Sequence, residues 1–279
     1  MPGAPLRSNW NGRIADPDPA LQEAAADLAP ATLPRIAADG RMPMQVYARP
    51  ADRNDPRPKI ALLLSGYGLA EAESRAAVAL PGAVDLAVSF YARQVDPLLD
   101  AARAGGHELL GSIPMESQGF PLNDAGYASL IVGGQPAVNG RNLRLALSHV
   151  PGAVGSTGAS DGFRGERYSA NPDAFGAVLA EVNKRGLIYI DPRPGAAPLA
   201  GVAGRSVDVV IDDPPARAEM EAKLNTLERV ARANGSALGL AGPLRAATIE
   251  RIASWAQELA GRGFVLVPVS ALARPAAKP

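Results

Sequence analysis

The stretch from Lys59 to Gly68, which reads KIALLLSGYG, constrains the fold more than any other part of the chain. Ile60 to Leu64 is an unbroken apolar run, which is typical of a strand buried on both faces in a parallel sheet. It runs into Ser65-Gly66-Tyr67-Gly68, where two glycines permit a tight turn or a close backbone approach. Chemistry in α/β proteins lies where strands open into such loops. We therefore expect the functional site to begin at Ser65 to Gly68.

An alternation of strands and helices continues from Lys59 to the end of the chain. Further strands are predicted over Val84–Phe90, His107–Ile113, Ala153–Val154, Leu187–Ile190, Val207–Ile211, Ala237–Leu240 and Val265–Val269. Helices are predicted over Leu69–Leu80, Pro97–Ala104, Asn139–Ser148, Asn171–Gly186, Pro214–Gly235 and Thr248–Ala260. Seven or eight strands, most of them followed by a helix, favour parallel βα units closed into an α/β barrel. An open doubly wound sheet is the alternative.

Three regions differ in composition. Residues 1–58 are rich in proline and poor in hydrophobic periodicity, which indicates an N-terminal extension or linker, with room for a short helix over Ala20–Leu28. Residues 59–273 form the predicted barrel, and residues 274–279 form a tail. A long loop over 117–136 interrupts the barrel, and a loop of this length is usually functional or mobile. A second loop, 155–169, is polar and rich in glycine.

Composition excludes several classes of function. The 28 Lys and Arg residues balance the 28 Asp and Glu residues, so no polyanion-binding surface is expected and nucleic acid is not an expected partner. The chain has no cysteine, which excludes disulfides, thiolate metal sites and cysteine nucleophiles. Neither a transmembrane run nor a secretion-signal pattern occurs in the sequence given.

Polar residues at the predicted strand ends are the candidates for chemistry. They are Ser65 and Tyr67, Ser112 and Glu116, Asp191 and Arg193, and Asp212 with Asp213. Glu116 and Asp191 could form an acid/base pair of the kind that hydrolases use. In the competing interpretation, Asp191 and Arg193 pair with each other or satisfy backbone groups.

Two further acidic positions have a plainer interpretation beside a functional one. Asp212-Asp213 precedes Pro214, where a helix N-cap and a partner for the helix dipole are expected. Asp161 lies in a polar loop, where it either faces solvent or lines a cleft.

Histidine content argues against a zinc centre, because a catalytic zinc usually takes three protein ligands, mostly histidine. The chain has two histidines. His107 begins its strand, at the wrong end for a barrel active site, and His149 ends a helix, where a cation suits the dipole. We expect both to be structural and no cofactor to be bound.

Several motifs, in order from Lys59 to Ala273, resemble the divergent polysaccharide deacetylase family, a branch of the NodB-homology carbohydrate esterases. ALLLSGYGL falls where relatives carry a strand ending in Asp-Asp-x-Gly. GHELLGSIPMES resembles G-H-E-x-L-x-H-x-P-M-E-P, VPGAVGSTGASDGF parallels G-A-V-G-x-N-N-H-M-G-S, and RGLIYIDPR resembles R-G-L-x-x-x-D-S-R. The terminal RGFVLVPVSAL fits the last strand. The resemblance implies a distorted seven-stranded (β/α) barrel that, in active members, uses a metal ion to remove acetyl groups from N-acetylated sugars.

The departures from the family pattern fall on the chemistry. Ser65 and Gly66 occupy the positions of the paired aspartates, and Ser112 stands where a histidine precedes Pro-Met-Glu. Ala159 lies near the position of a ligand histidine, and Pro243 near that of a later one. A site with these residues would not bind zinc as the family does. Loss of the ligands together, while the scaffold motifs persist, is the pattern expected of a pseudoenzyme.

Two functions follow from the resemblance. In the first, the protein has lost metal-dependent deacetylation and binds a glycan or an envelope protein in the old cleft, which Ser65, Tyr67, Ser112, Asp161 and Asp212 would line. In the second, it is a working carbohydrate hydrolase that uses Glu116 and Asp191, with Arg193 beside them, or a rebuilt site for zinc or another divalent metal. Aromatic residues near strand ends would favour glycan binding, although each could instead fill the core. They are Tyr67, Phe90, Tyr91, Phe120, Tyr127 and Phe163. The resemblance also implies a periplasmic or envelope-associated location.

Overall fold

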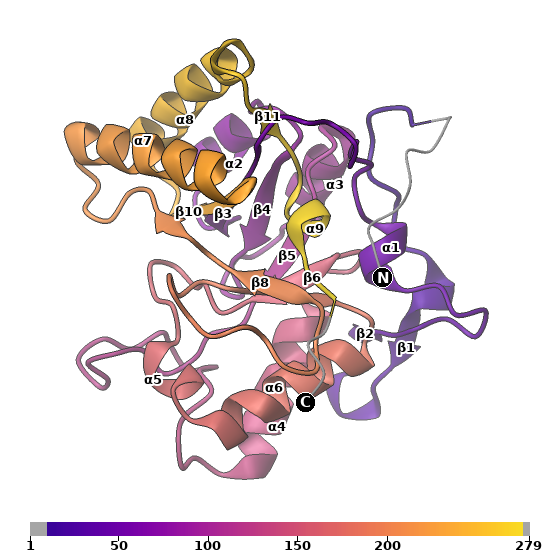
Figure 1. The fold of residues 1–279 in the computed structure, drawn as a ribbon. Helices are drawn as coiled ribbons and strands as arrows, with labels where there is room; N and C mark the ends of the chain where they lie inside the picture. The colour runs from indigo at the N-terminus through magenta and orange to yellow at the C-terminus, as the bar shows by residue number, and fades with distance from the viewer. Residues whose placement is uncertain (1–9, 276–279) are drawn as a thin grey trace.

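The computed structural model describes residues 10–275 and shows a curled parallel sheet surrounded by helices (Figure 1). The strands of this sheet run in the order β8-β7-β6-β5-β4-β3-β10-β9, and β11 pairs with the start of β3. They are β3 (Lys59–Tyr67), β4 (Val84–Val88), β5 (Leu109–Ser112), β6 (Gly155–Thr157), β7 (Ile188–Asp191), β8 (Gly204–Ser206), β9 (Val209–Val210), β10 (Ser236–Ala241) and β11 (Val265–Leu266). Every pair in the sheet is parallel. This architecture confirms the predicted distorted (β/α) barrel.

One extended segment, residues 204–211, joins the two edges of the sheet. Its first part, β8, pairs with β7, and its second part, β9, pairs with β10. Between them, the amide of Val207 donates to the carbonyl of Asp191 at 2.9 Å and the amide of Asp208 donates to the carbonyl of Leu238 at 2.8 Å. The sheet therefore curls back on itself, and within residues 10–275 it has, apart from β11, seven or eight strands depending on whether this segment counts once or twice.

Helices cover the outside of the sheet. They are α2 (Glu71–Val78), α3 (Asp96–Ala104), α4 (Pro136–Ser148), α5 (Glu166–Ser169), α6 (Pro172–Lys184), α7 (Arg217–Asn234), α8 (Ala246–Leu259) and the 3-10 turn η3 (Ala260–Arg262). The short helix α9 (Val269–Leu272) instead buries Val269 and Leu272 among the residues of the barrel interior. The predicted cap of α6 is confirmed, because the side chain of Asn171 accepts a hydrogen bond from the amide of Ala174 at 3.0 Å, with Pro172 at the first position. Gly186 and Gly235 follow α6 and α7 in the left-handed region, as expected.

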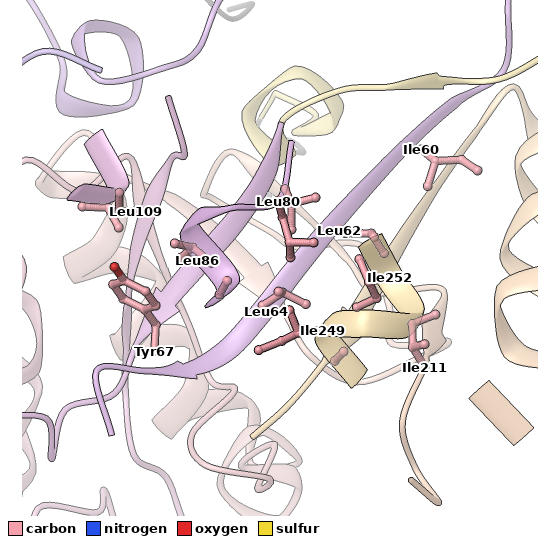
Figure 2. Packing of buried hydrophobic residues seen from close by; sticks show 14 of the residues in the cluster. Ile60, Leu62, Leu64, Tyr67, Leu80, Leu86, Leu109, Ile211, Ile249 and Ile252 are labelled. Atoms are coloured by element: carbon pink, nitrogen blue, oxygen red, sulfur yellow. The ribbon is translucent and has the colours of Figure 1, made fainter. Parts of the chain in front are cut away.

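The apolar run of β3 divides its side chains between two cores. Ile60, Leu62 and Leu64 pack outward against the helices, and Figure 2 shows Leu62 and Leu64 beside residues of α8. Ala61 and Leu63 lie in the second core, which fills the barrel interior. Because successive side chains of a strand alternate between faces, only a strand buried on both sides can be continuously apolar.

The N-terminal segment forms short elements that pack against the barrel. They are η1 (Pro19–Leu21), β1 (Gln22–Ala24), η2 (Ala26–Leu28), β2 (Thr32–Pro34) and α1 (Pro43–Val46), and β1 and β2 form an antiparallel pair. The predicted helix over Ala20–Leu28 is therefore wrong: two 3-10 turns and a strand occupy its place. The side chains of Ile14, Leu21 and Tyr47 are buried in the interior core, so tertiary packing outweighs local helix propensity here.

Several element boundaries differ from the sequence prediction. β3 continues through Tyr67 with a bulge after Ser65, where a turn was expected. β6 lies within the predicted loop, and the predicted final strand is short, because α9 begins at Val269. None of the helices among residues 10–275 is long and apolar enough to span a membrane.

Candidate functional site

Ser65 lies at the carboxyl end of β3, inside the end of the barrel that we call the mouth. It alternates with Ala61 and Leu63 of the interior core, so its side chain faces inward. The hydroxyl is buried and donates a hydrogen bond to the carbonyl of Ala241, at the end of β10, over 3.4 Å. The first position of the expected Asp-Asp pair therefore holds a buried hydroxyl bonded to the backbone.

Gly66, the second of these positions, lies against Pro243. Its φ is +86°, and a Cβ placed on it would lie 3.2 Å from both Cα and Cβ of Pro243. A Cβ on Gly162 would in turn lie 3.3 Å from Cδ of the same proline. Pro243 thus fills the space between Gly66 and Gly162, and any side chain at Gly66 would need both a left-handed backbone and a displaced proline. The close backbone approach expected at Gly66 is present.

Two other positions of the family pattern face the same interior. Ser112 ends β5, two residues after Leu110 of the interior core, and its buried hydroxyl has no hydrogen-bond partner among residues 10–275. Ala159 is buried in the interior core itself. Positions that carry ligands in the family pattern lie far apart in the sequence and meet at the mouth. In this chain they hold serine hydroxyls, the methyl group of Ala159, Gly66 and the ring of Pro243.

Asp161 forms a tight turn with Gly162 over the mouth. The flanking residues Ser160 and Phe163 exchange backbone hydrogen bonds of 2.9 and 2.8 Å, and φ is +53° at Asp161 and +97° at Gly162. Positive φ at both central residues defines a turn for which Asp-Gly is a favoured pair. The hydroxyl of Ser89 donates to the Asp161 carboxylate at 2.9 Å, and burial raises the pKa of that carboxyl. Asp161 is thus half-buried at the mouth, and its turn with Gly162 and its hydrogen bond from Ser89 give it a structural role there.

Asp212 holds the loop that carries Pro243. Its carboxylate oxygens accept hydrogen bonds from the amide of Gly242 at 3.0 and 3.1 Å and from the hydroxyl of Thr248 at 3.2 Å, and Arg245 lies 3.4 Å away. Burial raises the pKa of this carboxyl. The N-cap expected of Asp212-Asp213 is wrong, because the two prolines after it delay α7 and no side chain caps that helix.

Glu116 is bound by neighbouring loops. One carboxylate oxygen accepts the amide of Val132 at 2.6 Å, and the other lies 2.8 Å from Nε of Arg167. The side chain is buried, whereas that of Arg167 is more than half exposed. Its contacts therefore tie the long loop after β5 to α5.

Asp191 and Arg193 pair with each other, as the competing interpretation expected. Oδ1 of Asp191 accepts the backbone amide and Nε of Arg193 at 3.0 and 2.9 Å, and Oδ2 accepts Nη2 at 2.6 Å. These hydrogen bonds raise the pKa of the guanidinium, which also lies over the ring of Phe175 at 5.2 Å. Among residues 10–275, no hydrogen bond joins Asp191 to Glu116.

Tyr67 and His107 lie away from the interior of the mouth. The hydroxyl of Tyr67 donates to the carbonyl of Leu98 at 2.7 Å within the outer core. Both ring nitrogens of His107 face backbone carbonyls at the amino-terminal end of the barrel, and burial lowers the pKa of its imidazole. His149 follows α4 with its ring 5.5 Å from that of Phe90, and burial lowers the pKa of its imidazole, which disfavours the cation expected at this helix end.

The donors present at the mouth do not fit the metal of the family. Zinc takes imidazole, thiolate or carboxylate ligands, whereas Ser65, Gly66, Ser112, Ala159 and Pro243 offer at most two neutral hydroxyls. In the part of the chain that the structure describes, no three His, Asp or Glu side chains gather into a group that could hold a metal ion.

A cavity of about 640 Å³ lies beside the mouth, between the loops that follow β3 and β4. Its walls include Leu69, Tyr91, Arg93, Gln94 and Asp96. Tyr91 was recognised in the sequence as an aromatic residue near a strand end. No motif marks Arg93 or Gln94, because their place in the cavity depends on the course of the loop.

Aromatic rings form the rim next to this cavity. The ring of Tyr91 lies 5.3 Å from that of Phe90 and 5.4 Å from that of Tyr127, in edge-to-face arrangements. The side chain of Tyr127 is 86% exposed, and Leu122 on the same loop is 94% exposed. Three of the predicted aromatic residues therefore meet at one place on the surface.

Fold and mouth together define a polysaccharide deacetylase-like barrel with altered ligand positions. The sequence model of the family described as "Divergent polysaccharide deacetylase" matches residues 62–273, and the chain belongs to this family. It is also similar to the crystal structure of an uncharacterized protein from Agrobacterium tumefaciens, with 32% sequence identity and a TM-score of 0.80 over 87% of this chain and 99% of that chain. No curated protein matches the sequence significantly.

Proposed function

We propose that this protein binds a glycan at the mouth of the barrel without metal-dependent deacetylation. The contact between Gly66 and Pro243 is the observation that carries the proposal. It fills the space beside a position where the family pattern has an aspartate, so the missing carboxylate is replaced by packed protein. A family scaffold that keeps its mouth and its aromatic rim, but not its ligands, is better suited to holding a sugar than to activating water.

The second function, hydrolysis by Glu116 and Asp191, has less support. Each carboxylate is already paired, with Arg167 and Arg193 respectively. A general acid or base must reach the substrate proton within hydrogen-bond distance, and these carboxylates would first have to leave their arginines.

The test combines three measurements on protein purified without a histidine tag. Metal content is determined by mass spectrometry, deacetylation of N-acetylglucosamine oligomers is assayed with and without added zinc, and binding of the same oligomers is followed by calorimetry. We expect no stoichiometric transition metal, no turnover and measurable binding. A stoichiometric metal together with turnover that a chelator abolishes would refute the proposal. Inactive protein that binds no oligomer would favour an envelope protein as the partner.

The family resemblance also supports a place in the cell envelope, because relatives act on envelope polysaccharides. Fractionation of cells that produce the full-length native protein, followed by immunodetection, tests this part of the proposal. Recovery only in the cytosolic fraction would contradict it.

A further inference from the structure

We propose that the cavity lined by Leu69, Tyr91, Arg93, Gln94 and Asp96 is the pocket that binds the sugar, and that it takes a neutral oligosaccharide. This inference rests on the proposed function and places its binding site beside the barrel axis. At about 640 Å³, the cavity falls within the size range of about 300–1,000 Å³ that is usual for ligand pockets. It lies at the carboxyl ends of two adjacent parallel strands, β3 and β4.

The charges of the cavity balance one another. Arg75 is paired with Glu71 at 2.8 Å, and both line the cavity. Arg93 and Asp96 add one positive and one negative group, and neither makes an ion pair within residues 10–275. A strongly charged ligand would therefore lie near a group of its own sign as well as one of the opposite sign, so a neutral ligand fits best.

The unpaired polar groups are those that neighbouring sugar hydroxyls can use. The planar guanidinium of Arg93 and the amide of Gln94 each offer several N–H donors, and the carboxylate of Asp96 offers two acceptor oxygens. Tyr91 adds an aromatic surface against which the C–H groups of a sugar ring can pack, and exposed Tyr127 extends this surface along the rim.

The wall of the cavity is held in a specific conformation. Gln94 has φ +51°, and Gln94 and Asp161 are the two non-glycine residues with positive φ between residues 10 and 275. Such backbone is uncommon for glutamine and often occurs at functional sites. On the opposite side, Gly68 approaches Ala92 so closely that a Cβ at Gly68 would lie 2.7 Å from the Cβ of Ala92. The two loops are thus packed together at the edge of the cavity.

The test measures binding of the N-acetylglucosamine tetramer by calorimetry to wild-type protein and to Arg93→Ala and Gln94→Gly. Each variant removes donors of the cavity, and we expect each to weaken binding about fivefold or more, the effect of one lost hydrogen bond. Gln94→Gly also relieves the left-handed backbone, so its thermal stability should equal or exceed that of the wild type. A loss of binding in this variant would therefore result from the change in the pocket and not from a loss of folding. Arg229→Ala, on the exposed face of α7, is the matched control and should bind as the wild type does.

Other outcomes separate this inference from the proposed function. Wild-type binding that survives both cavity variants but is lost in Ser112→Ala or Asp161→Asn would place the sugar in the barrel interior and overturn the inference alone. Tighter binding of a uronic acid tetramer than of the neutral one would overturn the ligand class. If wild-type protein binds neither tetramer, both the proposed glycan binding and this inference are refuted.

Discussion

Two buried carboxyl groups at the base of the barrel should make stability depend on pH. Asp85 of β4 and Glu108, just before β5, are fully buried. Glu108 accepts hydrogen bonds from the amide of Arg49 at 2.8 Å, from the amide of Ser270 at 3.1 Å and from the hydroxyl of Ser270. Asp85 accepts the amide of Val269 at 2.6 Å. The pair therefore joins the N-terminal segment and α9 to the sheet.

Burial raises the pKa of both carboxyl groups, and that of Glu108 rises from 4.5 to about 7. Folded protein therefore keeps the proton of Glu108 over a pH range in which unfolded protein has released it. The stabilisation is fully present below about pH 4.5 and is lost as the pH rises through about 7. At about 1.4 kcal/mol per pKa unit, the free energy of unfolding should fall by about 3 kcal/mol across this range because of Glu108.

Glu108→Gln removes this titration while keeping the shape of the side chain. The variant should lose about 1–2 kcal/mol at pH 5, because its amide nitrogen cannot accept the Ser270 amide. Its free energy of unfolding should then change much less between pH 5 and pH 8 than that of the wild type. Urea unfolding followed by circular dichroism at several pH values measures both quantities.

His107 and the other titrating groups are present in both proteins, so the difference between wild type and variant reports Glu108 together with its effect on the neighbouring carboxyl of Asp85. Glu221→Gln, on the exposed face of α7, is the control and should show the wild-type pH dependence. A Glu108→Gln variant that loses as much stability as the wild type between pH 5 and pH 8 would refute the assignment.

Three further substitutions test other parts of the structure by the same unfolding measurement. Gly66→Asp should destabilise by about 1–3 kcal/mol, because it forces a left-handed aspartate against Pro243; unchanged stability together with new metal binding would contradict the described contact. Tyr67→Phe should cost about 1–2 kcal/mol by leaving the buried carbonyl of Leu98 without its donor, and it should leave oligosaccharide binding unchanged; lost binding would place Tyr67 in the site. Leu62→Ala, in the outer core, should cost about 2–5 kcal/mol. A loss below about 1 kcal/mol would mean that neighbouring side chains close the space left by the leucine side chain.

The sequence predicted the barrel because its strands are strongly patterned. A continuous apolar run such as Ile60–Leu64 needs two buried faces, and parallel strands covered by helices provide them. The N-terminal segment was not predicted, because its short elements depend on long-range contacts such as that of Tyr47 with the interior core. The segment 204–211 was also hard to foresee, since its pairing changes from one strand to another within a few residues.

The candidate site was predictable in part. Family motifs indicated which positions meet at the mouth, and Ser65, Ser112 and Ala159 do face the barrel interior. Side-chain partners were not predictable, because the contact of Glu116 with Arg167 joins separate loops. The left-handed backbone of Gln94 has no sequence signal either, since glutamine does not favour it.

The altered mouth is held in place by its own contacts, and this bears on whether the lost chemistry could be restored. Asp212 binds the amide of Gly242, which positions Pro243 against Gly66 and Gly162. Replacing Gly66 alone by aspartate would therefore meet the proline, and replacing Pro243 alone by histidine would bring one ligand to a mouth where the other family positions hold hydroxyl and methyl groups. Because each change is unfavourable or useless without the other, we expect that single substitutions cannot rebuild a metal site. The packed mouth is thus a stable alternative to the metal-binding one, built on the same barrel.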